Sequence, residues 1–338
     1  MFSKAKFFLS SSQFSHTQPI HTLLSSPLFK SLLPSSVRIV EVSPRDGLQA
    51  ESTIVNTNDK IQFINLLSKC GFKTIEATSF VNPKAVPQMS DALEIMSNLP
   101  PNCDHISFPV LVPNIKGYIN AKNANAKEVS IFTAGSDTFQ KTNTNCTIDE
   151  SFERFDPIFK AAKEDGIAVR GYISCALGCP YEGPVSPSRV VHLTEKLLEK
   201  GCYEVSIGDT IGVASPGTVF TLFDLLSKAN IPSDKLAGHF HNTYGQALAN
   251  ILVALNFEIK IFDTSVCGIG GCPFAKGSTG NVATEDVLNL LHSLNIKHDI
   301  DIKKMMVAGE FIRSKLGRKE TPLERALKID HPYFKSFF

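Results

Sequence analysis

Several features that are absent from the sequence limit what this protein can be. No apolar run approaches the ~20 residues that a membrane-spanning helix needs. The net charge is only +1, so the composition favours neither nucleic acid nor another polyanion as a partner. The eight cysteines are sparse for 338 residues and none of them form a C-x-x-C pair. We therefore expect reduced thiols rather than a disulfide framework or a structural zinc site.

Acidic residues are also absent from Met1 to Val40, a stretch that is rich in Ser, Phe and Leu and carries a few Lys and Arg residues. This composition is typical of a mitochondrial transit peptide, and we predict one over residues 1–36, disordered, with the mature protein in the mitochondrial matrix. The alternative is a disordered extension without a targeting role. The last residues, Lys335 to Phe338, do not form a peroxisomal signal.

The rest of the chain alternates short β-branched runs with amphipathic helical patterns at a spacing of roughly 30 residues. We expect strands at 37–42, 74–80, 106–112, 128–132, 168–174, 203–207, 236–241 and 261–266, with helices between them and a last one at 284–294. Eight such units predict an α/β fold of the (β/α)8 TIM-barrel type, because doubly wound sheets usually have fewer strands. The predicted domain runs from 37 to 319, with C-terminal helices as a small extension and a tail at 320–338.

The chemistry of such a barrel is carried by residues at the carboxyl ends of its strands. Polar side chains occupy these positions along the whole chain: Arg45 and Asp46, Glu76, Tyr172 and Ser174, Ser206 and Asp209, His239 and His241, and the segment from Cys267 to Asn281. We expect them to converge on one mouth of the barrel.

His239 and His241 are separated by one residue in an apolar run, so on a strand both imidazoles would lie on the same face. They are either metal ligands or two partly exposed loop histidines. Together with Asp46 and an amide such as Asn281, they would form a mixed nitrogen and oxygen ligand set. Such a set fits an octahedral Mg²⁺ or Mn²⁺ better than tetrahedral Zn²⁺, which it does not exclude.

Two further candidates lie beside these ligands. Arg45 could stabilise an enolate or carboxylate oxygen, or it could form a structural ion pair with Glu76 at the rim. Cys272 lies in the glycine-rich segment Gly268 to Pro273, which lacks the third glycine of a dinucleotide fingerprint. Its thiol could be a proton donor or nucleophile on a rim loop, or simply a small buried side chain.

Five segments, taken in order, resemble the 3-hydroxy-3-methylglutaryl-CoA lyase family over about residues 37–318. They are Val40 to Gln49 (VEVSPRDGLQ), Ile75 to Phe80 (IEATSF), Arg170 to Cys175 (RGYISC), Gly208 to Gly212 (GDTIG) and Gly268 to Phe274 (GIGGCPF). One departure is Asn242 after His241, where the animal lyases are expected to have aspartate.

The resemblance implies a metal-dependent lyase that cleaves 3-hydroxy-3-methylglutaryl-CoA to acetyl-CoA and acetoacetate, in ketone-body formation and leucine degradation. It implies Asp46, His239, His241 and Asn281 as ligands of Mg²⁺ or Mn²⁺, and a homodimer. It also implies catalytic roles for Arg45 and Cys272, with Glu76 and Asp209 as supporting acids. Arg45, Tyr172, Ser206 and Lys319 are the expected substrate-binding residues. Either Asp46 or a metal-bound water could remove the hydroxyl proton.

Two alternatives to the lyase follow from the same residues. One is a Claisen-type synthase that condenses an acyl-CoA with a 2-oxo acid, since such barrels share the Arg-Asp-Gly start and the H-x-H strand. The Gly-Gly-Cys-Pro segment and the absence of a large domain after Lys319 favour the lyase. The other is a catalytically silent barrel, which predicts a missing ligand or acid, whereas all the expected groups are present.

Overall fold

A computed structural model describes residues 33–271 and 280–327, and strands and helices alternate along the chain. The strands are β1 (Arg38–Glu41), β2 (Thr74–Ile75), β3 (Thr78–Ser79), β4 (Val110–Leu111), β5 (Glu128–Ala134), β6 (Ala168–Ser174), β7 (Glu204–Asp209), β8 (Leu236–Phe240) and β9 (Ile261–Thr264). The α-helices are α3 (Thr57–Leu67), α4 (Ala92–Ser97), α5 (Ile115–Asn123), α6 (Asp137–Thr144), α7 (Ile148–Asp165), α8 (Pro187–Lys200), α9 (Pro216–Lys228), α10 (Ala247–Asn256), α11 (Thr284–Ser293), α12 (Ile302–Leu316) and α13 (Pro322–Leu327).

All the strands are parallel, and their order in the sheet is β2-β1-β9-β8-β7-β6-β5-β4-β3. The two ends of this order, β2 and β3, are separated in sequence only by Glu76 and Ala77. The amide of Glu76 donates to Glu41 on one side, and that of Ala77 donates to Pro109 on the other. The sheet therefore closes on itself, and counting β2 and β3 as one strand gives the eight strands of the predicted barrel.

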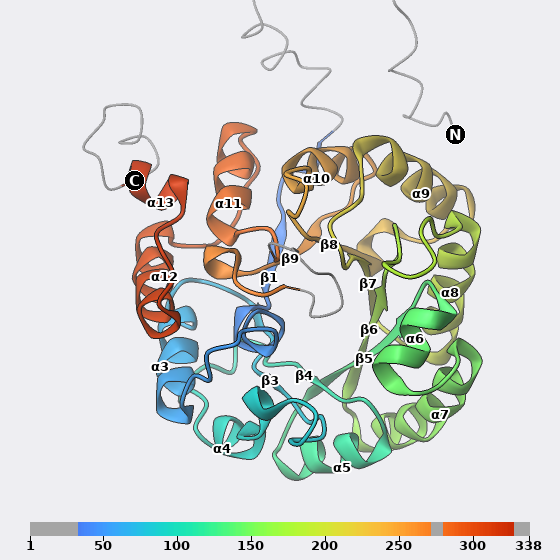
Figure 1. The fold of residues 1–338 in the computed structure, drawn as a ribbon, viewed down its shortest axis with the longest axis horizontal. Helices are drawn as coiled ribbons and strands as arrows, with labels where there is room; N and C mark the ends of the chain where they lie inside the picture. Colours follow the sequence, from blue (N-terminus) through green and yellow to red (C-terminus); the bar gives the residue numbers. More distant parts are fainter. Residues whose placement is uncertain (1–32, 272–279, 328–338) are drawn as a thin grey trace, which may run out of the picture.

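Figure 1 shows the strands as a central ring with the helices around it. Apolar side chains of the ring and of the inner helix faces form one large buried core. Helix α12 packs against α3, so the last helices cover the join between the first and last units of the ring. Barrel and C-terminal helices thus agree with the prediction.

Local signals explain where several helices begin and end. Thr147 and Glu150 form the predicted capping box at the start of α7, with both reciprocal hydrogen bonds in place. Proline occupies the first turn of α8 and α9, where its missing N–H costs nothing. Gly166 and Gly201 follow α7 and α8 in the left-handed conformation that such ends require.

The predicted strand at 106–112 is reduced to β4, several other bounds shift by a few residues, and two further differences have clear causes. The predicted strand at 74–80 is divided, because the facing strand has Pro109, which lacks the N–H needed to continue the ladder. Helix α6 was not predicted, because the sequence DTFQKTNT has few apolar residues. Its N-cap, Ser136, accepts from the amide of Phe139, a signal that polar composition obscured.

No helix in the described ranges is long and apolar enough to cross a membrane. The seven cysteines in these ranges form no disulfide with one another. The transit-peptide prediction and the end of the tail fall on residues 1–32 and 328–338, which lie outside the described residues, and so does Cys272.

Candidate metal centre and cavity

The carboxyl ends of the strands surround a cavity of about 650 Å³. Its wall takes residues from the last part of several strands and from the loops that follow, including Arg45, Asp46, Tyr172, His239 and His241. Five of the sequence-predicted site residues thus meet on one surface although nearly 200 positions separate the first from the last. This convergence is the arrangement in which barrel enzymes place their chemistry.

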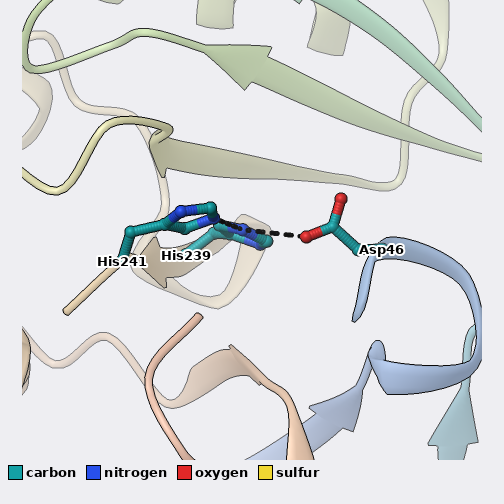
Figure 2. Close-up of side chains that lie close together, drawn as sticks. All are labelled: Asp46, His239 and His241. Atoms are coloured by element: carbon teal, nitrogen blue, oxygen red, sulfur yellow. Dashed lines mark hydrogen bonds and ion pairs between the residues drawn. The ribbon is translucent and has the colours of Figure 1, made fainter. Parts of the chain in front are cut away.

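Asp46, His239 and His241 form a cluster whose possible ligand atoms all lie within 4.8 Å of one another. The turn Ser43–Gly47 after β1 carries Asp46, while β8 and the next residue carry the histidines. Figure 2 shows the two imidazoles and the carboxylate directed toward a common point. Nε2 of His239 is 3.2 Å from Nε2 of His241 and 3.8 Å from Oδ2 of Asp46.

The distance between the two imidazole nitrogens fits ligation of one divalent metal ion, whereas the 3.8 Å between His239 and Asp46 is longer than a shared ion requires. Two ligand atoms bonded to one ion at ~2.1 Å are about 3.0–3.4 Å apart, for octahedral or tetrahedral angles alike. The 3.2 Å between the two imidazole nitrogens falls in this range. The donor set of two imidazoles and a carboxylate is common to several first-row metals and to magnesium, so it does not identify the ion.

Asn281 lies at the edge of this cluster. Its Nδ2 donates to Oδ2 of Asp46 at 2.9 Å and to the carbonyl of Ile269 at 3.3 Å. Its Oδ1 is buried and has no hydrogen-bond partner in the described part of the chain. Because the two ends of an amide exchange by rotation, the same position could present the oxygen toward the cluster.

The electrostatics of the cluster keep two of its three groups in the forms that bind a metal ion. Burial raises the pKa of Asp46, but Arg45 and both histidines outweigh it and lower the pKa to about 2. Burial, together with the neighbouring charge of His239, lowers the pKa of His241 to about 3. At neutral pH Asp46 is therefore ionised and His241 neutral, the forms in which these side chains bind metals.

Arg45 lies between the cluster and a second carboxylate. Its guanidinium donates to Oε2 of Glu76 at 2.7 Å through Nε and to Oδ1 of Asp46 at 2.6 Å through Nη1. Burial alone would lower the pKa of Arg45. The negative charges of Glu76 and Asp46 raise this pKa by more than burial lowers it, so the guanidinium is charged. Its Cζ lies 5.3 Å from the centre of the Tyr172 ring. Arg45 thus forms the ion pair with Glu76 that the sequence suggested, and it also lines the cavity.

Ser174 also lines the cavity, whereas the structure places four other predicted site residues away from the cavity wall. Glu76 is fully buried beneath Arg45. Asp209 is fully buried and accepts from the amides of Val213 and Ala214, so it shapes the turn before α9. Ser206 donates to Oδ2 of Asp263 at 2.7 Å. Lys319 is exposed after α12.

The side-chain oxygen of Asn242, the departure noted in the sequence, is directed to the start of helix α10. Its Oδ1 accepts from the amide of Ala247 at 3.2 Å, the first residue of α10. Its side chain therefore helps to begin that helix.

Sequence reasoning missed several buried charges that support the site, namely Glu41, Arg170, Glu204 and Asp263. Each lies in a barrel strand that also contains two or more apolar residues. A charge in such a strand has to be paired inside the barrel, since charged residues are almost never fully buried alone. This signal was available in the sequence.

Glu41 joins the two segments that flank the cluster. One carboxylate oxygen accepts from the amides of Ser43 and Val266, each at 3.0 Å, and the other accepts from the hydroxyl of Thr284 at 2.8 Å. The turn that carries Arg45 and Asp46 is thereby tied to the segment after β9. Burial raises the pKa of Glu41 to about 7, although these hydrogen bonds act in the opposite direction.

A pH-dependent stability follows for Glu41. Its pKa is higher in the folded state than in the unfolded state, so its contribution is fully present below about pH 4.5 and is lost as the pH rises toward 7. We expect Glu41→Gln to remove this dependence. Between pH 4 and pH 8, the free energy of unfolding of wild type should therefore fall by on the order of 3 kcal/mol more than that of the variant. Urea unfolding of both proteins at several pH values measures it, and parallel curves would contradict it.

Comparisons with known proteins agree with this geometry. A family model described as HMGL-like matches residues 36–312. The mitochondrial hydroxymethylglutaryl-CoA lyase of Macaca fascicularis is 52% identical over 287 residues, which cover 85% of this chain and 88% of that protein. A cytoplasmic 3-hydroxy-3-methylglutaryl-CoA lyase of Danio rerio is 52% identical over 288 residues, 85% of each chain.

Solved structures show the same relationship. The crystal structure of hydroxymethylglutaryl-CoA lyase from Pseudomonas aeruginosa superposes with a TM-score of 0.85 at 46% identity, covering 88% of this chain and 98% of that one. This chain therefore belongs to the HMGL-like family, among the hydroxymethylglutaryl-CoA lyases.

Proposed function

We propose that this protein is a metal-dependent carbon-carbon lyase that cleaves 3-hydroxy-3-methylglutaryl-CoA to acetyl-CoA and acetoacetate. The observation that carries the proposal is the meeting of Asp46, His239, His241 and Arg45 on the wall of one cavity. Membership of the lyase family supports the same substrate.

Asp46, His239 and His241 would hold the ion, with Asn281 as a fourth ligand through Oδ1. When bound, a divalent ion supplies a positive charge that lowers the pKa of a nearby hydroxyl and orients it. We propose Mg²⁺ or Mn²⁺, since an amide oxygen and a carboxylate beside two imidazoles suit a six-coordinate ion.

The reaction needs a proton removed from the tertiary hydroxyl of the substrate. The bond between the hydroxyl-bearing carbon and the carbon next to the thioester then breaks, which releases acetoacetate and leaves the enolate of acetyl-CoA. Asp46 lines the cavity and is ionised, which makes it a candidate to accept the hydroxyl proton, and its low pKa makes it a weak base for this step. A proton returned to the enolate carbon completes the balance.

Arg45 is the group best placed to stabilise the enolate oxygen. Its guanidinium is held by Glu76 and Asp46, and it keeps N–H donors beyond those it uses with these carboxylates. Because the group is fixed before the reaction, it needs no reorganisation as charge develops. We assign the carbon-directed proton to Cys272, which lies outside the described residues.

Supporting roles follow from the contacts. Glu76 fixes Arg45, and Tyr172 lines the cavity where it can bind the acyl group. Asp209 and Ser206 support the site without lining the cavity. Asp209 accepts from a backbone amide, and Ser206 donates to the carboxylate of Asp263. We also propose that Lys319 contacts the phosphates of CoA, since its side chain is exposed.

The proposal extends to the setting of the enzyme. We propose residues 37–319 as the catalytic barrel, a homodimeric assembly, and import into the mitochondrial matrix through residues 1–36. Both mitochondrial and cytoplasmic relatives exist, so import is tested by the location of a full-length fusion to a fluorescent protein.

Product analysis distinguishes the lyase from the Claisen-type synthase. Purified protein with Mg²⁺ and 3-hydroxy-3-methylglutaryl-CoA should release acetoacetate and acetyl-CoA in equal amounts. Acetyl-CoA with a 2-oxo acid should give no condensation product. Condensation without acetoacetate release would establish the synthase, and neither reaction would favour the silent barrel.

A further inference from the structure

The two histidines of the cluster differ in the hydrogen bonding of Nδ1, the ring nitrogen that is directed away from the other imidazole. Nδ1 of His239 lies 3.2 Å from Oδ2 of Asp263, and both side chains are buried. Nδ1 of His241 is also buried, but it has no hydrogen-bond partner in the described part of the chain. One imidazole is therefore fixed by a carboxylate and the other is not.

Asp263 is itself held rigidly. Nη2 of Arg170 donates to its Oδ1 at 2.7 Å, Nη1 of Arg170 lies 3.2 Å from its Oδ2, and Ser206 donates to Oδ2 at 2.7 Å. Arg170 in turn donates through Nε to Glu204 at 2.7 Å. All these side chains are nearly or completely inaccessible to solvent. A carboxylate fixed by a fork of two donors has little freedom to rotate.

We propose that Asp263 is a positioning residue for the metal centre: it accepts the Nδ1–H of His239 and leaves Nε2 as the ligand atom. This inference rests on the metal site of the proposed function. A carboxylate behind a metal-binding histidine fixes the tautomer and the ring orientation and makes the imidazole a stronger ligand. The carboxylate of Asp263 lies behind Nδ1, while Nε2 faces the cluster.

The network also joins the metal cluster to the Arg45 pair. Nη1 of Arg170 donates to the Tyr172 hydroxyl at 2.6 Å, and that hydroxyl donates to Oε2 of Glu76 at 3.2 Å. Oε2 of Glu76 is the atom that holds Arg45. Arg170 therefore orients His239 through Asp263, and Arg45 through Tyr172 and Glu76. Ser206 serves the same arrangement as a second donor to Asp263.

Binding of Mn²⁺ alone, without substrate, tests the role of Asp263. Asp263→Asn keeps the size of the side chain but loses the charge, and we expect Mn²⁺ affinity to fall by ~10–100-fold. In a His239→Ala background the same substitution should cause little further loss, because the residue acts through that ring. An affinity within twofold of wild type, or an equal loss in both backgrounds, would overturn the proposal.

Asp263→Asn removes one of the two buried carboxylates that pair with Arg170 and could prevent folding, so a second measurement uses the wild-type sequence. In protein labelled with ¹⁵N-histidine, the shifts of His239, assigned by comparison with His239→Ala, should report a protonated Nδ1 and an unprotonated Nε2 when a diamagnetic ion such as Mg²⁺ is bound. The opposite tautomer would overturn the proposal. Neither readout depends on turnover, so lack of lyase activity would refute the proposed function without affecting this inference.

Discussion

His241→Ala is expected to lose more than ~100-fold in Mn²⁺ affinity and nearly all lyase activity. Residues that merely orient a ligand are worth ~10–100-fold in metal affinity or activity, so removing a ligand should cost more. His241 is the ligand whose loss is simplest to interpret. Burial and the charge of His239 lower its pKa and keep it neutral, and its Nδ1 has no hydrogen-bond partner in the described ranges.

Equilibrium titration with Mn²⁺, followed by electron paramagnetic resonance of the free ion, measures this loss. His192→Ala is a matched control, because His192 is exposed on α8, away from the cavity wall. The control should bind Mn²⁺ as wild type does. Unchanged stoichiometry and affinity in His241→Ala would remove this residue from the ligand set.

Arg45→Met is expected to lower kcat by ~10²–10³-fold, the usual cost of losing one fixed donor to a developing oxyanion. The effect should appear in kcat more than in KM, since the donor is needed mainly as the enolate forms. Steady-state kinetics of acetoacetate release measure both constants.

The same substitution leaves the buried carboxylate of Glu76 without its ion-pair partner, which costs about 3–5 kcal/mol of folding free energy. The double variant Arg45→Met with Glu76→Gln should regain stability but not activity. Arg189→Met is the control, because Arg189 pairs with Asp137 at the surface. Recovery of kcat in the double variant would show that Arg45 acts only by stabilising the fold.

The barrel and the core of the site could be predicted because each depends on a local pattern plus one topological rule. Strands and helices follow from periodicity and caps. Once eight units are recognised, the carboxyl ends of the strands must share one mouth, which brings Asp46 to His239 and His241. The assignments of Cys272 and Asn281 as catalytic group and ligand remain predictions.

The features of the site that could not be predicted depend on which side of a strand faces the barrel axis, and on partners far away in the sequence. Asp209 and Ser206 were assigned to the mouth because they follow or end a strand, whereas Asp209 turns back to backbone amides and Ser206 points to Asp263. Asp263 itself, in the run Ile261–Thr264, gives no local sign that it will meet Arg170, 93 positions away. Such pairs appear only when the sheet is closed.

The central claim is that the cleavage depends on a divalent ion held by Asp46, His239 and His241. The most direct test measures acetoacetate release after treatment with EDTA and again after adding Mg²⁺ or Mn²⁺, with metal content followed by elemental analysis. We predict that release stops with the metal removed and returns when either ion is added. Undiminished release from protein that contains no metal would contradict this claim.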